Sequence, residues 1–247
     1  MDPAAHRDDI FGQRPTRIRV DLDAISHNLQ ALAAHAGVPV MPIIKANAYG
    51  HGLARVGLHL QAQGAGQLGV AFLEEGIALR RAGVTLPILV MGGIFGPQAA
   101  TVIANDLDVT VSSIDKLRQV EAAAEALGRK ATIHLKIDTG MERIGVHSYR
   151  AGPFIEAAVA SRWCTVKGVY SHLACSDEPD SPMTQSTWPR SSSKETPLTA
   201  RTVASRETKR TSRSRTVTKG SPLGRAGAAR AISGDFISFI SPSGIRC

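Results

Sequence analysis

A lysine ends an apolar run in segment 41–52, which reads Met-Pro-Ile-Ile-Lys-Ala-Asn-Ala-Tyr-Gly-His-Gly. The aliphatic, partly β-branched residues of segment 38–44 are typical of a buried strand, and Lys45 follows them directly. Two interpretations are open, because an unpaired ammonium loses its hydration at such a position. Either Lys45 reaches solvent or a carboxylate, or its amine has a depressed pKa and attacks carbonyl groups, as Schiff-base lysines do.

The turn after Lys45 favours the second interpretation. It gathers polar, ring-bearing and flexible residues: Asn47, Tyr49, Gly50, His51 and Gly52. The glycines allow backbone conformations that other residues resist, and a helix predicted from about Leu53 would present N–H groups to a phosphate. A lysine that forms a Schiff base beside a phosphate site is what pyridoxal 5'-phosphate requires.

Two further segments carry candidate groups, and each follows a predicted strand. Segment 136–145 reads Lys-Ile-Asp-Thr-Gly-Met-Glu-Arg-Ile-Gly, and segment 170–177 reads Tyr-Ser-His-Leu-Ala-Cys-Ser-Asp. Taken alone, Arg143 is better explained by a surface salt bridge, and His172 by a structural role. No base is paired with Cys175, so a buried or incidental thiol is the simpler interpretation.

Segment 45–52 closely resembles the pyridoxal-phosphate attachment motif of alanine racemases, and segment 136–145 resembles a second motif of that family. The resemblance spans roughly residues 14–185. It implies a TIM-type barrel that holds pyridoxal 5'-phosphate on Lys45. It also implies an isomerase that interconverts L- and D-alanine for peptidoglycan precursors, with Lys45 as a base on one face of the substrate.

The resemblance also assigns roles to four other residues. Tyr49 would hydrogen-bond the cofactor phosphate, and His172 would pack against the cofactor ring. Arg143 would lie near the phenolic oxygen of the cofactor and the substrate carboxylate, which suits a planar guanidinium that stays charged. Lys136 matches a position that is carbamylated in some members of the family, where it helps to orient the arginine.

Strand and helix patterns alternate along segment 17–170. Strands are predicted at 17–22, 40–44, 68–72, 86–91, 107–111, 131–137 and 166–170, and helices at 53–62, 74–82, 97–105, 114–127 and 151–160, with a further helix capped by Asp23. Such alternation predicts a parallel α/β sheet, either doubly wound or closed as a barrel. The family resemblance selects an incomplete (β/α)8 barrel with about six of its eight strands.

The charge divides the chain into unlike parts. The net charge is +8, yet residues 186–247 hold 12 Lys+Arg and 3 Asp+Glu, which leaves 17 basic and 18 acidic residues in 1–185. We therefore expect a flexible leader at 1–15, a barrel domain at 16–185 and a disordered basic tail at 186–247, in which an apolar patch at 236–240 has no evident partner. The tail has almost no aromatic residues for base stacking, so nucleic-acid binding is not favoured.

The resemblance stops near residue 185, and this shapes the expected activity. In the family, the remaining barrel strands and a C-terminal β-domain follow, and that β-domain brings a second catalytic base, a tyrosine, across a homodimer interface. We find no such motif in 186–247, which reads like a translation in another frame, so we expect racemisation to be impaired or absent. A non-catalytic, pyridoxal-phosphate-binding barrel is the alternative. The sequence shows neither an apolar signal segment nor a membrane span, which favours a cytoplasmic protein. The spacing of its cysteines does not fit a metal site, so we expect none.

Overall fold

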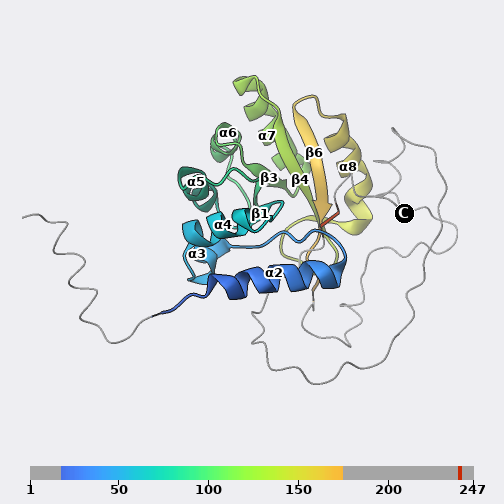
Figure 1. Ribbon diagram of the computed structural model, residues 1–247. Coiled ribbons are helices and arrows are strands. Elements are labelled where there is room, and N and C mark those ends of the chain that lie inside the picture. The colour runs from blue at the N-terminus through green and yellow to red at the C-terminus, as the bar shows by residue number, and fades with distance from the viewer. Residues whose placement is uncertain (1–17, 175–238, 241–247) are drawn as a thin grey trace, which may run out of the picture.

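The computed structural model describes residues 18–174 and 239–240. Helices and strands alternate along the first of these ranges (Figure 1). The helices are α2 (Leu22–Ala36), α3 (Lys45–Tyr49), α4 (Leu53–Ala62), α5 (Leu73–Arg81), α6 (Gln98–Ala104), α7 (Ile114–Leu127) and α8 (Ala151–Ala160), with a 3-10 turn, η1 (Ser148–Arg150). The strands are β1 (Leu68–Val70), β2 (Ile88–Val90), β3 (Asp108–Val111), β4 (Ala131–Asp138), β5 (Val146–His147), β6 (Cys164–Tyr170) and β7 (Phe239–Ile240).

The sheet has the strand order of a barrel. Strands β1, β2, β3, β4 and β6 lie side by side in chain order, and each adjacent pair is parallel. A doubly wound sheet would reverse its strand order at a switch point, and this sequential order does not. Figure 1 shows helices α5 to α8 in an arc around the strands. The prediction of an incomplete (β/α)8-type barrel is therefore confirmed.

Helix α7 of this arc begins and ends at residues that its sequence marks. Ser113 caps α7 by accepting a hydrogen bond from the Lys116 N–H at 3.2 Å, and Gly128 ends the helix in the left-handed conformation. The bounds predicted for α7 and α8 match the structure. Their apolar sides pack on β3, β4 and β6 through residues such as Val120 and Phe154, which are almost fully buried.

Three predictions about the first part of the barrel are corrected. Residues 18–21 form no strand, and α2 begins at Leu22 with Asp21 rather than Asp23 as its cap. Asp21 is better placed because its side chain accepts from the N–H groups of residues 23 and 24. The strand predicted at 40–44 is reduced to one parallel bridge, between Ile43 and Gly69. Pro42 lies within this run and has no N–H to donate, so this segment cannot form a continuous ladder of hydrogen bonds with β1.

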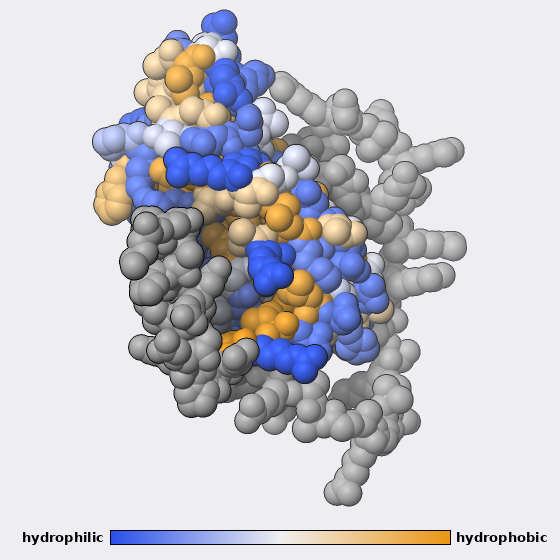
Figure 2. Space-filling model, turned by 60° about the vertical axis from the view of Figure 1, so that its left-hand side comes forward, coloured by the Kyte–Doolittle hydropathy of each residue, from blue (hydrophilic) through white to orange (hydrophobic). Residues whose placement is uncertain are grey.

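One prediction about the C-terminal segment is corrected. Residues Phe239–Ile240 form β7, which pairs antiparallel with Val169 and Tyr170 of β6, so this part of the apolar patch does have a partner. The predicted leader and the rest of the predicted tail lie outside the described residues. Figure 2 shows hydrophobic patches among hydrophilic residues on one face, and the exposed large apolar side chains include Phe72, Phe95 and Tyr149. None of the helices in residues 18–174 has both the length and the hydropathy that a membrane span requires.

Candidate functional site

Lys45 lies just beyond the carboxyl end of the first parallel segment. Pro42 O accepts from the Gly69 N–H at 2.9 Å, and the Ile44 N–H donates to Gly69 O at 2.8 Å, which fixes this segment beside β1. Lys45 is half-buried, and its Nζ lies 5.8 Å from the centroid of the Tyr49 ring. In parallel α/β barrels, ligand sites are built at this end of the strands.

The backbone of α3 after Lys45 is left-handed, so this segment is a turn and not a regular α-helix. Four successive non-glycine residues, Ala46 to Tyr49, have φ between 52° and 55°, and Gly50 closes the turn at φ 86°. The left-handed conformation costs each L-residue roughly 1–2 kcal/mol, so the turn stores several kcal/mol that its surroundings must offset. Strain of this kind gathers at functional sites, where it fixes a side chain that a relaxed backbone would place elsewhere.

Hydrogen bonds from side chains hold this turn in place. Glu75, the third residue of α5, accepts from the Ala46 N–H at 2.6 Å through Oε1, and from the Ala71 and Phe72 N–H groups at 2.9 and 3.1 Å through Oε2. Asn47 Oδ1 accepts from the Leu53 N–H at 2.8 Å, which ties the turn to the start of α4. We did not predict Glu75 from the sequence. Its position at the third residue of a helix was the available signal, because glutamate there turns back to the helix N-terminus.

Lys136 is buried on the inner side of the sheet. Residues of β4 alternate between the helix-facing core, which takes Ile133 and Leu135, and the opposite side, which takes His134 and Lys136. The Lys136 Nζ lies 4.9 Å from the centroid of the Tyr170 ring, whose hydroxyl is 2.7 Å from Thr110 Oγ1.

The charge on Lys136 is therefore costly. Burial lowers the pKa of Lys136 to about 8; Asp138 opposes this shift, and Arg143 adds to it. A substantial fraction of this amine is thus neutral near pH 8. A neutral amine is the reactive form towards carbon dioxide, so the environment is compatible with the carbamylation that the sequence resemblance implies.

Asp138 shapes the loop that carries Arg143. Its Oδ1 accepts from the N–H groups of Gly140 and Glu142 at 2.8 and 3.2 Å, and its Oδ2 accepts from the Arg143 N–H at 3.2 Å. Burial alone would raise the pKa of Asp138, but these backbone hydrogen bonds outweigh it and lower that pKa. Gly145 returns the loop to β4, since a Cβ there would lie 2.8 Å from the Asp138 nitrogen. The exposed Arg143 side chain is thereby held at the carboxyl end of β4.

His172 lies at the same end, beside this loop. Lys136 pairs with Tyr170 in the β4–β6 ladder, so His172 follows β6 at the level of Asp138. His172 is 8% exposed, and the adjacent Ser171 Oγ is 2.6 Å from Thr139 Oγ1, which joins the two strand ends. This burial gives the His172 imidazole a defined position at the carboxyl end of β6.

The structure places the five candidates at one end of the sheet, in two groups. Lys45 and Tyr49 lie next to β1, whereas Lys136, Arg143 and His172 lie on or after β4 and β6. Strands β2 and β3 lie between the groups. In a curved sheet, the ends of such strands face a common space, which is how a barrel assembles one site from separate strands.

A second polar cluster lies at the other end of the strands. Asp108, the first residue of β3, accepts hydrogen bonds from Gln67 Nε2, Lys167 Nζ and His134 Nε2 at 3.1, 2.9 and 3.1 Å. Burial alone would raise the pKa of Asp108, but the hydrogen bonds from His134 and Lys167 outweigh burial and lower that pKa. The carboxylate therefore stays ionised at pH values below those at which an aspartate usually takes up its proton. The cluster satisfies charges buried inside the barrel, and we assign it to stability.

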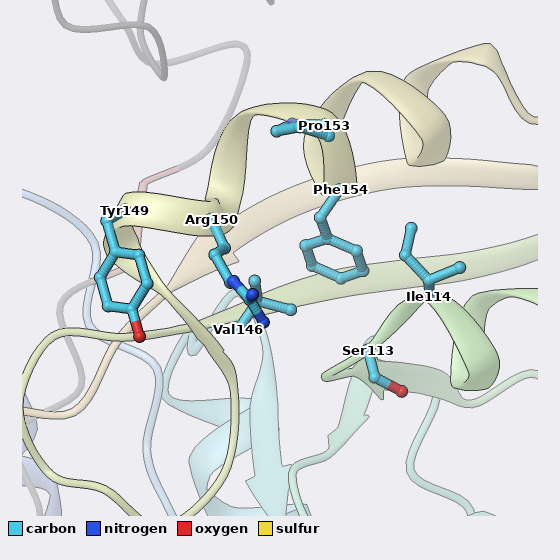
Figure 3. A pocket seen from close by; sticks show the side chains of 7 residues that line it. All are labelled: Ser113, Ile114, Val146, Tyr149, Arg150, Pro153 and Phe154. Carbon is cyan, nitrogen blue, oxygen red and sulfur yellow. The ribbon is translucent and has the colours of Figure 1, made fainter.

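A cavity in the described part of the chain is separate from the candidate side chains. It has a volume of about 460 Å³ and lies between the start of α7, β5 and the start of α8 (Figure 3). It is lined by Ser113, Ile114, Val146, Tyr149, Arg150, Pro153 and Phe154. Ile114, Val146 and Phe154 make it largely apolar, and the Ser113 hydroxyl already caps α7.

Comparisons with known proteins agree with this geometry. The sequence profile described as "Alanine racemase, N-terminal domain" matches residues 20–208. The alanine racemase of Symbiobacterium thermophilum is 40% identical over 178 residues, which are 72% of this chain and 47% of that protein. That of Mycolicibacterium smegmatis is 42% identical over 167 residues, which are 66% and 43%. The chain thus spans about half the length of the curated relatives it matches.

Solved structures give the same result. The alanine racemase from a D-cycloserine-producing Streptomyces lavendulae aligns with a TM-score of 0.65 at 40% identity, over 70% of this chain and 47% of that chain. The enzyme from Oenococcus oeni aligns with a TM-score of 0.63 at 35% identity, over 70% and 50%. With its parallel barrel strands and its profile match over most of its length, this chain belongs to the family of alanine racemase N-terminal domains.

Proposed function

We propose that this chain forms the pyridoxal-phosphate-binding barrel of an alanine racemase. The observation that carries the proposal is Lys45, half-buried at the carboxyl end of a parallel segment and fixed by a strained left-handed turn. A strained turn of this kind fixes the position of the neighbouring side chain, and a lysine that must meet an aldehyde needs a fixed position. The family uses pyridoxal 5'-phosphate, and the membership of this chain supports the same cofactor here.

The chemistry of the candidate side chains fits this cofactor. Lys45 supplies the primary amine that holds its aldehyde carbon. Tyr49 supplies a hydroxyl for its phosphate, and the buried His172 supplies a flat ring to pack against it. When bound, pyridoxal 5'-phosphate provides an electron-withdrawing ring that lowers the energy of removing the Cα proton of an amino acid.

The remaining side chains bind and orient the substrate. The Arg143 guanidinium stays charged and pairs bidentately with a carboxylate, which suits the carboxyl group of alanine. The Asp138 carboxylate holds the Arg143 backbone, so the loop presents this side chain from a fixed point. Once the amino group of alanine has displaced it from the cofactor, the free Lys45 amine would take the proton from Cα and return it on the same face.

Inversion at Cα also needs a proton donor on the opposite face. We assign Lys45 as the base on one face, and we find no second base for the other face among the described residues. A general acid–base group is typically worth about two to four orders of magnitude in rate. A protein with a base on one face only would exchange the Cα hydrogen of alanine faster than it inverts the centre.

The test compares these two rates. Soluble protein with pyridoxal 5'-phosphate is incubated with L-alanine in deuterium oxide. Loss of the Cα proton signal is followed by NMR, and D-alanine by chiral chromatography. Exchange that depends on Lys45 supports the proposal, and its absence together with retained cofactor binding would favour the non-catalytic barrel. D-Alanine formed as fast as deuterium enters would show that a second base is present.

The cellular role follows from the reaction. We propose that it supplies D-alanine for peptidoglycan precursors in the cytoplasm, with alanine as the small-molecule substrate. A homodimer is the assembly expected for the family, and light scattering of the purified chain tests it.

A further inference from the structure

We propose that Glu75 is a positioning residue for Lys45, and this inference rests on the proposed function. Its carboxylate holds the left-handed turn that begins at Ala46, the residue next to Lys45, against the end of β1. Neither of the motifs that suggested the function contains Glu75.

The contacts of Glu75 make it a bridge between two separate parts of the chain. One carboxylate oxygen accepts from the Ala46 N–H at 2.6 Å, and the other accepts from the Ala71 and Phe72 N–H groups. Ala71 follows β1, and Phe72 precedes α5, so both are anchored to the barrel. The bond to Ala46 spans 29 residues of sequence and is therefore a tertiary restraint.

This bond acts on the peptide unit that joins Lys45 to Ala46. Fixing the Ala46 N–H fixes the orientation of that peptide plane, and with it the direction in which the Lys45 side chain leaves the backbone. Hydrogen bonds to an ionised acceptor are shorter and stronger than neutral ones. A charged acceptor is needed here because the residues that follow are not glycines and would relax to the right-handed region.

The neighbouring residue provides a matched control. Glu74 is also in the first turn of α5, and it is exposed. Within the described part of the chain, it makes no hydrogen bond or ion pair. Substitution at Glu74 removes a negative charge from the same helix end without touching the turn.

The experiment has two arms and uses the full chain with Glu75→Ala, Glu75→Gln and Glu74→Ala. The first arm measures amide hydrogen exchange without cofactor. We expect exchange at Ala46 to rise at least about tenfold in Glu75→Ala, since a charge-assisted hydrogen bond is lost. Glu75→Gln should give a smaller rise because its amide retains one acceptor oxygen, and Glu74→Ala should give none. Exchange in α7 serves as the internal reference and should not change.

The second arm measures where the cofactor attaches. Each protein is incubated with pyridoxal 5'-phosphate and reduced with borohydride, and the share of label on Lys45 relative to other lysines is measured by peptide mass mapping. We expect this share to fall about tenfold in Glu75→Ala and to recover partly in Glu75→Gln. A uniform loss of stability would not change which lysine is labelled.

The two arms separate the possible failures. Unchanged exchange at Ala46 in Glu75→Ala, or an unchanged share of label on Lys45, overturns the inference. If Glu75→Ala does not fold, the isosteric Glu75→Gln decides by the same two criteria. Absence of label on Lys45 in the unsubstituted chain overturns the proposed function instead, and the exchange arm still decides whether Glu75 holds the turn.

Discussion

Replacing Lys136 by methionine should remove a pH dependence of folding stability that one buried amine creates. Methionine has a similar length and no charge, so Lys136→Met keeps most of the packing against Tyr170. In the folded chain, the pKa of Lys136 falls from 10.5 to about 8, chiefly through burial. The folded state therefore disfavours the protonated amine, which the unfolded state tolerates.

The direction of this pH dependence follows from the number of protons that the folded and unfolded states bind. Below about pH 8 the amine is charged in both states, and the folded state bears the full cost, about 3 kcal/mol at ~1.4 kcal/mol per pKa unit. As pH rises towards 10.5, the folded state loses its proton first and the cost disappears, so this contribution to stability rises with pH. About 2 kcal/mol of it should be recovered between roughly pH 6 and pH 9.5.

The assay is urea unfolding of the unsubstituted chain and of Lys136→Met, followed by circular dichroism at several pH values. Buffers free of carbon dioxide keep the amine unmodified. Other titrating groups are common to both proteins and cancel in the difference. Lys130→Met, at an exposed lysine, should leave the pH dependence unchanged. If the difference between Lys136→Met and the unsubstituted chain is the same at the lowest and highest pH, the reasoning about burial is wrong.

Three further predictions concern polar side chains buried inside the barrel. Because the pKa of Asp108 is lowered, its stabilisation is present above its unfolded value of about 3.8 and lost as pH falls through the folded value. Asp108→Asn should therefore cost about 2 kcal/mol at pH 7 and progressively less in acid, by urea unfolding; a constant difference would contradict this. Tyr170→Phe removes the hydroxyl that lies 2.7 Å from Thr110 Oγ1 and should cost about 1–2 kcal/mol of unfolding free energy; no loss would mean that this bond is absent. Lys136 should form a carbamate with ¹³C-labelled bicarbonate at pH 8 to 9, seen by ¹³C NMR, and a signal that persists in Lys136→Met would place the adduct elsewhere.

The order of helices and strands could be predicted because most elements carry local signals. Ser113 and Gly128 mark both ends of α7, and aliphatic runs mark β3 and β4. The segment before Lys45 misled the prediction, since its apolar residues read as a strand while Pro42 and pairing on one side leave a single bridge. The closed or open form of the sheet depends on strand order, which periodicity does not encode.

The identity of the site residues could be predicted, but their restraints could not. Alanine, asparagine and tyrosine have no preference for the left-handed region strong enough to predict the turn at 46–49. The bond that holds this turn comes from Glu75, which lies in another helix. Long-range pairs such as Asp108 with Lys167 depend in the same way on strand neighbours that only the folded sheet brings together.

The central claim is that Lys45 is the residue that holds pyridoxal 5'-phosphate, and one measurement tests it most directly. The full chain is incubated with the cofactor, reduced with borohydride, digested and mapped by mass spectrometry, with Lys45→Arg treated in parallel. The account predicts a pyridoxyl adduct on Lys45 and its loss in Lys45→Arg, together with the absorbance of the bound cofactor. An adduct on Lys136 or on another lysine, with Lys45 unmodified, would contradict it.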